Sequence, residues 1–160
     1  MAYKFYLQKA SASYAPVGEP IDIEAAYNGL KYRSISGLET KGAVKNIYTE
    51  SYADSDTLRV WHPSDIDSPV LHEATEVTLS VVVLGTGARD VLDSFRKLLY
   101  SGRLLWWDTA RHRKACLILQ DEQTVTNDTI KGLRYIAQEF RFTNVWGTTK
   151  PCEDDGTITE

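Results

Sequence analysis

The stretch EVTLSVVVLGTGARDVLDSFRKLLY, from Glu76 to Tyr100, contains the clearest strand and the clearest helix in the chain. In its first part, alternate apolar side chains share one face: Val77, Leu79, Val81 and Val83. Val82 and Leu84 make the opposite face partly apolar as well. Because strands with apolar residues on both faces lie in the middle of a sheet, we predict a central strand that is covered on both sides.

The second part of this stretch, residues 88–100, predicts the main helix. Apolar side chains recur at helical spacing along one stripe: Val91, Leu92, Phe95, Leu98 and Leu99. Charged residues fall largely outside this stripe, and Gly102 follows as a C-terminal cap. An amphipathic helix of this kind needs a sheet to pack against, so we expect one helix flanking a sheet.

The glycines that join the strand to the helix also match the opening of a dinucleotide-binding fingerprint. The third glycine of that fingerprint would fall at position 90, where Asp90 stands instead. An aspartate at a helix N-terminus would repel a pyrophosphate. The chain also lacks alternating strands and helices. We therefore interpret Gly85 and Gly87 as a tight connection and expect no cofactor.

The next stretch, SGRLLWWDTARHRKACLIL at 101–119, predicts a β-hairpin that turns within TARH. Alternation along a strand sends one of Trp106 and Trp107 into the core and the other outward. A large exposed aromatic side chain often marks a contact surface. We therefore predict a subunit interface on this hairpin, in which arginines pair with carboxylates of a neighbour. Its residues are Trp106, Trp107, Arg111 and Arg113, with Trp61 as a further contact.

A nucleic-acid contact is the alternative interpretation of this hairpin. The cluster at 111–114 offers cations for phosphates, and the tryptophans offer stacking faces. Asp108 and the formal net charge of −4 weaken that interpretation. We expect no sequence-specific binding of nucleic acid.

Most of the remaining chain predicts strands, at 4–8, 30–36, 42–52, 57–62 and 133–146. In 30–36, Leu30 and Tyr32 alternate against Ile35. The last strand is long, so we expect it to extend beyond its sheet or to bend at a bulge. Ile136, Phe140 and Phe142 would share one of its faces. We interpret Asn127 and Asp128 as a turn.

Two stretches differ in composition from this body. Residues 50–73 carry six acids and two prolines around one short strand, which predicts an extended loop arm. Residues 147–160 are polar and acidic, and we expect them to form a flexible C-terminal tail. The chain is thus expected to form a single β-rich domain at 1–146, with the loop arm at 50–73, followed by the tail at 147–160.

Bulk composition fits one soluble domain: 160 residues, 42% hydrophobic and 25% charged. We find no secretory signal and no apolar run long enough for a membrane span. Cys116 and Cys152 form no C-x-x-C pair, so we expect two free thiols in a reducing compartment.

Catalytic and metal-binding motifs also find little support in the sequence. His62 and His72 lie near Asp65, Asp67 and Glu73, which could in principle bind a metal. Helical metal-ligand spacing is missing, and so is a G-x-S-x-G nucleophile motif. We expect a solvated acidic loop, no metal, no catalytic residues and no enzymatic activity.

The order of these elements resembles the bacteriophage tail-tube superfamily, which includes tail tubes, distal-tail and terminator rings, and type VI secretion tubes. The resemblance covers about residues 3–146, and EFRFTNVWG at 139–147 looks like the closing strand of such subunits. It implies a mainly β fold: an antiparallel β-sandwich or barrel-like sheet pair with one flanking helix, a long inter-strand loop and a flexible tail.

The resemblance also implies a structural protein of the virion tail, assembled in the bacterial cytoplasm. Its partners would be other tail proteins and copies of itself, in a commonly hexameric ring that stacks into a tube and forms a conduit for DNA or effectors. Sheet edges, the loop arm and the tail would reach neighbouring copies. We would place the basic cluster at a protein contact rather than in the lumen. The rival interpretation is a ligand-binding module, either a small β-barrel for an apolar ligand or a carbohydrate binder that uses Trp61, Trp106, Trp107 or Trp146.

Overall fold

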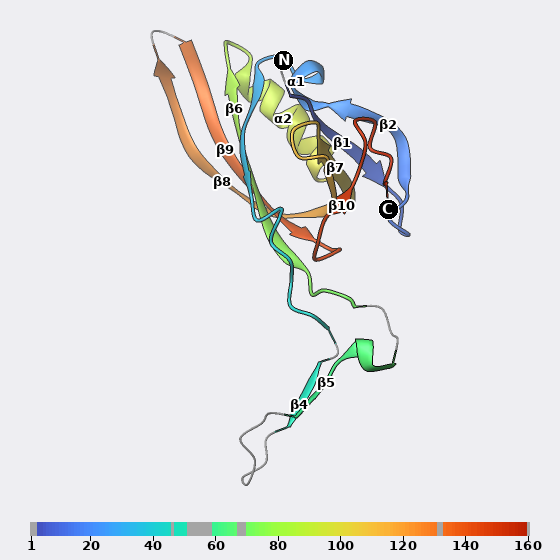
Figure 1. The fold of residues 1–160 in the computed structure, drawn as a ribbon. Coiled ribbons are helices and arrows are strands. Elements are labelled where there is room, and N and C mark those ends of the chain that lie inside the picture. The colour runs from blue at the N-terminus through green and yellow to red at the C-terminus, as the bar shows by residue number, and fades with distance from the viewer. Residues whose placement is uncertain (1–2, 46, 51–58, 67–69, 131–132, 160) are drawn as a thin grey trace.

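The computed structural model describes residues 3–45, 47–50, 59–66, 70–130 and 133–159 (Figure 1). The strands are β1 (Phe5–Ala10), β2 (Pro16–Asp22), β3 (Leu30–Ser36), β4 (Tyr48–Glu50), β5 (Arg59–Trp61), β6 (Thr75–Leu84), β7 (Leu104–Asp108), β8 (Arg113–Ile130), β9 (Leu133–Asn144) and β10 (Lys150–Pro151). The helices are α1 (Ile23–Ala26) and α2 (Ala88–Leu99), and η1 (Pro63–Ile66) is a 3₁₀ turn.

One antiparallel eight-stranded sheet forms the body, in the order β2-β1-β7-β8-β9-β6-β3, with β10 paired to β8. Figure 1 shows this sheet bent around α2, so that β1, β2 and β7 face β6, β8 and β9 across the helix. The start of β8 pairs with β7 and its remainder with β9, so this strand belongs to both halves. The predicted mainly β, antiparallel, sandwich-like fold with a flanking helix is confirmed.

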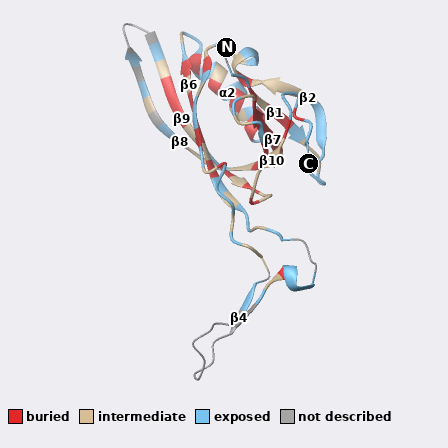
Figure 2. Cartoon of the chain, in the orientation of Figure 1, coloured by how far each residue is buried: buried red, intermediate tan, exposed pale blue. Residues whose placement is uncertain are grey.

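The core lies between the two halves of the sheet, as the buried residues in Figure 2 show. All four predicted inward residues of β6 are fully buried: Val77, Leu79, Val81 and Val83. The strand is central, because β3 and β9 pair with its two edges. Its other face is only partly covered, since Leu84 remains 38% exposed.

Helix α2 fills the concave side of the bend with the stripe predicted from its sequence. Leu92, Phe95 and Leu99 are buried, and Phe95 packs edge-on against Phe140 of β9, with ring centroids 5.7 Å apart. Gly85 turns the chain from β6 into α2 with a φ of 101°, which a residue with a side chain rarely adopts. The glycine connection predicted at this point is therefore confirmed.

The β8–β9 hairpin is the longest element and extends beyond the body (Figure 1). The bulge expected in the last strand lies instead in its partner β8, where the register shifts between Leu119 and Asp121 and again between Thr124 and Thr126. The predicted turn at Asn127 and Asp128 is wrong, because both residues pair within the ladder. β-Branched neighbours favour an extended chain here, and the strand continues to Ile130.

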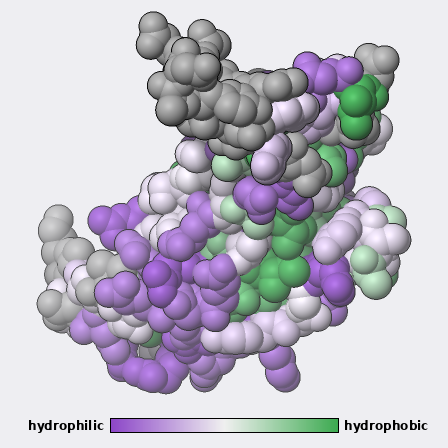
Figure 3. Space-filling view, turned by 90° about the horizontal axis from the view of Figure 1, so that it is seen from below, coloured by the Kyte–Doolittle hydropathy of each residue, from purple (hydrophilic) through white to green (hydrophobic). Residues whose placement is uncertain are grey.

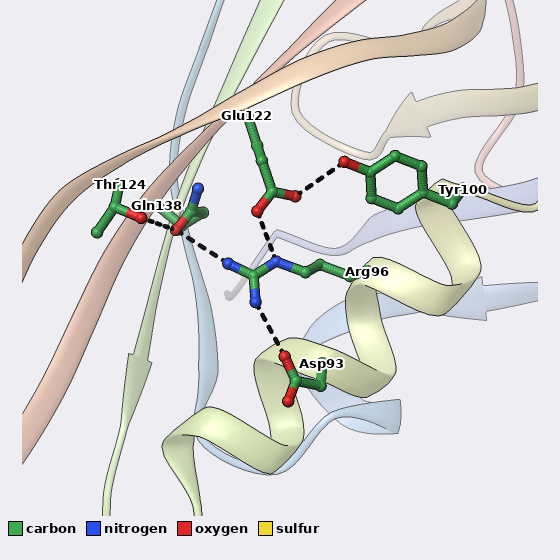
Figure 4. Close-up of polar contacts among 6 residues, drawn as sticks. All are labelled: Asp93, Arg96, Tyr100, Glu122, Thr124 and Gln138. Carbon is green, nitrogen blue, oxygen red and sulfur yellow. Dashed lines mark hydrogen bonds and ion pairs between the residues drawn. The ribbon is translucent and has the colours of Figure 1, made fainter.

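Polar contacts tie this hairpin to α2, as Figure 4 shows for Asp93, Arg96, Tyr100, Glu122, Thr124 and Gln138. The guanidinium of Arg96 lies 2.7 Å from a carboxylate oxygen of Glu122 on β8 and donates a 3.4 Å hydrogen bond to Gln138 on β9. The Tyr100 hydroxyl donates to Glu122 at 3.4 Å. Arg96 therefore links the helix to both strands of the hairpin.

Strand β3 departs from simple alternation. Its pairing with β6 shifts register between Tyr32 and Ser34, so Arg33 lies at a bulge. Leu30 and Ile35 are consequently both buried in the same core cluster, and Tyr32 packs against it. The sequence pattern had placed Ile35 on the opposite face, and the bulge is the reason that this prediction is wrong.

The loop arm begins earlier than position 50 and carries a small sheet of its own. Strands β4 and β5 pair only in this arm and not in the main sheet, although the sequence predicted strands there. The Lys45 N–H bonds the Leu71 carbonyl at 2.8 Å, so the two legs of the arm run side by side. Figure 1 shows the arm projecting below the body. Residues 51–58 and 67–69 of the predicted arm lie outside the described residues.

Candidate assembly surfaces

The two tryptophans of the β7–β8 hairpin point to opposite sides of the sheet, as predicted. Trp106 belongs to the main core, where its ring lies 6.1 Å from Phe5 and 6.2 Å from Tyr32. Trp107 belongs to a second cluster on the other face and stacks on Tyr6 at 5.4 Å. Both are fully buried, so neither offers the exposed aromatic surface expected on this hairpin.

Residues 147–159 cover Trp107. The indole N–H of Trp107 donates to the Asp154 carbonyl at 3.1 Å, and Gly156 lies so close that a Cβ there would be 2.7 Å from the ring. Cys152 is buried next to it, and β10 pairs with β8. The expectation of a flexible tail is therefore wrong. The outward-facing tryptophan was the sequence signal that another segment must cover this face of the sheet. The polar composition of residues 147–160 gave no indication that they form this cover.

The basic cluster at 111–114 is largely used within the subunit. Arg111 donates to the fully buried Asp108 at 3.0 Å, and His112 lies 2.5 Å from Asp154. Lys114 donates to the Gly156 carbonyl at 2.8 Å, and its ammonium group lies 4.8 Å from the centre of the Trp107 ring. Burial lowers the pKa of Lys114, and nearby Cys152 and Asp155 oppose this shift. These contacts fasten the C-terminal segment to the hairpin.

Of the five predicted interface residues, only Arg113 and Trp61 are exposed. Trp106, Trp107 and Arg111 are held by contacts inside the subunit. A role for these five residues in contacts between subunits stays a prediction, and three of them already make contacts within the subunit.

The arm carries an exposed aromatic pair. Tyr48 of β4 and Trp61 of β5 pack with ring centroids 5.0 Å apart, and they are 62% and 38% exposed. Ile66 in η1 is 81% exposed. Exposed apolar side chains on a projecting element are typical of a contact surface.

The histidines of the arm lie apart. The His62 ring contacts the Ser64 hydroxyl at 2.8 Å, whereas the His72 ring contacts the Gly42 carbonyl at 2.9 Å. Over the part of the chain that the structure describes, no three residues of the ligating types His, Cys, Asp and Glu are grouped for a metal ion. Asp67, named in that hypothesis, lies outside this part. The described helices include none with the length and apolar character to cross a membrane.

The two thiols lie in one apolar cluster but are free and buried. Burial raises the pKa of Cys116 and of Cys152 to about 11. The Cys152 N–H bonds the carbonyl of His112, four positions before Cys116 in the chain. That offset corresponds to roughly 13 Å of strand, beyond the reach of a disulfide.

Two hollows lie at the lower end of the body, where β9 ends and β10 begins. Their volumes are about 320 and 300 Å³, and they share the lining residues Trp146 and Lys150. The ammonium group of Lys150 lies 4.5 Å from the centre of the Trp146 ring. We call these hollows the Trp146 groove, which is lined by Ser13, Tyr14, Pro16, Lys45, Val70, Leu71, His72, Leu105, Lys114, Val145, Trp146, Thr148, Lys150, Gly156, Thr157 and Ile158.

Seen from below, Figure 3 shows hydrophobic residues gathered in the middle of this face, with hydrophilic residues around them. Trp146 is the tryptophan of the body that lines the groove; Trp106 and Trp107 belong to the buried clusters. Each of the two hollows is lined by one tryptophan, Trp146, so neither is the tryptophan-lined pocket that would favour the ligand-binding interpretation.

Both edges of the main sheet carry features that discourage edge-to-edge pairing. Edge strand β2 contains Pro16 and Pro20, which cannot donate backbone hydrogen bonds. Edge strand β3 has the bulge at Arg33 and an exposed Lys31. The arm and the groove are thus better suited to contacts than the sheet edges, which the sequence analysis had named beside the arm.

Comparison with known proteins gives matches of structure only. No protein-family model and no curated protein matches the chain. The fold is similar to that of the SPP1 Dit protein, described as a paradigm of the hub adsorption apparatus in phages that infect Gram-positive bacteria. The match has a TM-score of 0.51 at 11% identity and covers 97% of this chain and 51% of that one.

A structure of the phage P2 baseplate in its activated conformation with Ca also matches, with a TM-score of 0.51 at 10% identity, over 89% of this chain and 44% of that one. At such identities the matches show the fold alone. The fold is similar to those of these phage Dit and baseplate structures, so the resemblance predicted from element order is confirmed at the level of the fold. The chain spans about half the length of the structures it matches.

Proposed function

We propose that this protein is a structural component of a phage or phage-like tail, which acts by association and not by catalysis. The observation that carries the proposal is the likeness of the whole fold to solved Dit and baseplate structures. The projecting arm with its exposed aromatic pair supports it, because such an arm has no evident task in a solitary subunit.

The proposed assembly is a ring of identical subunits, commonly a hexamer, that joins other tail proteins in the virion after assembly in the bacterial cytoplasm. Stacked rings would form a tube for DNA or effectors. A heterologous contact, in which one surface meets a different surface of the next copy, closes into rings or continues into helical tubes. An arm on one copy and a groove on the next are surfaces of this kind.

Multi-angle light scattering and negative-stain electron microscopy of the purified chain test this proposal. The expected result is a ring-sized particle that appears as protein concentration increases. A monomer up to the highest soluble concentration, with no rings in the images, would refute self-assembly. Co-purification with other tail proteins from cells that express the whole tail operon tests the second set of partners.

A further inference from the structure

The chemistry of the Trp146 groove limits what it can receive. Its walls are apolar, from Leu105, Val145, Ile158 and Leu71, while Lys45, Lys114 and Lys150 supply positive charge. None of the described lining residues carries a carboxylate. The groove therefore suits a partner that combines apolar or aromatic side chains with negative charge.

The arm of this same protein has that combination. Residues 50–73 contain six acids and a single Lys or Arg, Arg59. Tyr48, Trp61 and Ile66 present apolar surface, and the exposed Asp65 stands beside Ile66. A two-stranded sheet alone is only marginally stable in water, so the β4–β5 hairpin gains from a surface to pack on.

The geometry favours a second copy as the donor of the arm. The legs of the arm themselves line one side of the groove, through Lys45, Val70 and Leu71. From there the arm leads away from the body, and β4 and β5 lie well below it (Figure 1). Strands β4 and β5 thus lie away from the groove of their own subunit.

We propose that the Trp146 groove of one copy receives the arm of another copy. The aromatic pair Tyr48–Trp61 and Ile66 pack on the apolar walls, and the carboxylate of Asp65 pairs with Lys45 and Lys150. The inference rests on the self-association proposed above and names the two surfaces that produce it. Because they differ, each subunit both gives an arm and receives one.

Cross-linking between two chains with one added cysteine each tests the docking directly. Chains with Ile66→Cys on the arm and chains with Thr148→Cys in the groove are mixed and treated with a short bismaleimide. The native thiols are buried and react slowly, because burial raises their pKa to about 11. The expected product is a cross-linked pair that contains one chain of each kind. The matched control pairs Ile66→Cys with Arg134→Cys, an exposed position near the opposite end of β9.

Light scattering on the same samples separates the two proposals. Assemblies that give the product joining position 66 to position 148, and that do not give the control product, support the docking. Assemblies in which both groove and control positions fail to cross-link, or react equally, overturn the docking and leave self-association intact. A mixture that stays monomeric and gives no specific product overturns both.

A charge exchange adds a second, independent readout. Lys150→Glu places a carboxylate where the arm acids should bind, so we expect self-association to weaken by about tenfold or more. Lys97→Glu makes the same charge change at an exposed position of α2 and should leave association unchanged. Adding Asp65→Lys to Lys150→Glu should restore part of the loss. Equal effects of the two single variants, or no recovery in the double variant, would contradict the assigned contact.

Discussion

At the scale of single residues, the adjacent tryptophans show how one strand contributes side chains to two hydrophobic clusters. Trp106 is packed in the main core beside Phe5 and Tyr32, and its indole N–H is buried without a hydrogen-bond partner among the described residues. Trp107 has a donor bond to Asp154 and a cation above its ring. One side chain therefore supports the main core by volume alone, whereas the other holds the C-terminal segment in place.

The first prediction compares Trp107→Phe with Trp106→Phe. Loss of the Trp107 hydrogen bond and weakening of its cation–π contact should lower the free energy of unfolding by about 1–3 kcal/mol. Amide exchange of residues 150–157 should accelerate, because they lose their anchor. Trp106→Phe leaves a cavity but also removes an unpaired N–H, so it should not accelerate exchange in that segment. Hydrogen exchange with mass spectrometry measures both, and equal exchange in the two variants would contradict the anchor.

The second prediction concerns the buried thiols. Their pKa in the folded chain, about 11, exceeds the value of about 8.5 in unfolded chains. Folding therefore keeps protons that the unfolded chain releases, and this contribution is fully present below about pH 8.5 and lost as pH rises toward 11. We expect the free energy of unfolding to fall over that window. Cys116→Ala should make the fall shallower, as urea titrations at several pH values would show.

At the scale of elements, irregularities decide where the chain goes. A bulge turns Ile35 inward on β3, and two bulges interrupt the pairing of β8 with β9. Glycines act similarly at the root of the arm, where Gly147 has a φ of 66° and meets the backbone of Glu73. The Gly42 N–H bonds the Gly147 carbonyl at 2.8 Å. The root is thus fixed by backbone contacts.

The third prediction is that Gly147→Ala loosens the root of the arm. A Cβ there would lie 2.2 Å from the Glu73 carbonyl oxygen, so Glu73 at the root of the arm must move away from residue 147. We expect a loss of about 2–3 kcal/mol in stability from strain and lost contacts. Gly18→Ala is the matched control, because Gly18 also has positive φ but open space around it. It should cost only about 1 kcal/mol. Thermal unfolding ranks the two, and a larger loss for Gly18→Ala would contradict the packing argument.

The regular elements could be predicted from the sequence, whereas the irregular features could not. The alternation of Val77 to Val83 and the stripe on α2 reflect burial on one face, which a local pattern records. The bulge at Arg33 depends on β6, a partner distant in sequence, and the length of β8 was missed because Asn127 and Asp128 were interpreted as a turn. The sequence also did not predict the segment that covers Trp107. That segment is polar in composition, and it contacts the ring through a glycine and backbone groups.

At the scale of the whole molecule, the body and the arm are expected to have separate roles, in stability and in association. The core lies in the body, whereas the arm is joined through two paired legs. The ends of those legs lie together, since Lys45 and Leu71 share a backbone hydrogen bond. Stability should therefore come from the body, and association from the arm.

The fourth prediction is that an arm-less chain folds but does not assemble. Replacing residues 46–70 with a short Asn-Gly turn joins Lys45 to Leu71 without stretching the legs. We expect a cooperative thermal transition within a few degrees of that of the full chain, together with a monomeric mass in light scattering. Rings formed by this variant would show that association uses other surfaces.

The pairing of strand β8 also has a consequence for how the subunit unfolds. β8 pairs with β7 in one half of the sheet and with β9 in the other. Neither half can therefore unfold without the loss of backbone hydrogen bonds in the other half. Heat should therefore convert the body in one all-or-none event, with equal calorimetric and van't Hoff enthalpies. In the proposed conduit, such a subunit would keep its shape until it unfolds as a whole, rather than fray from one side.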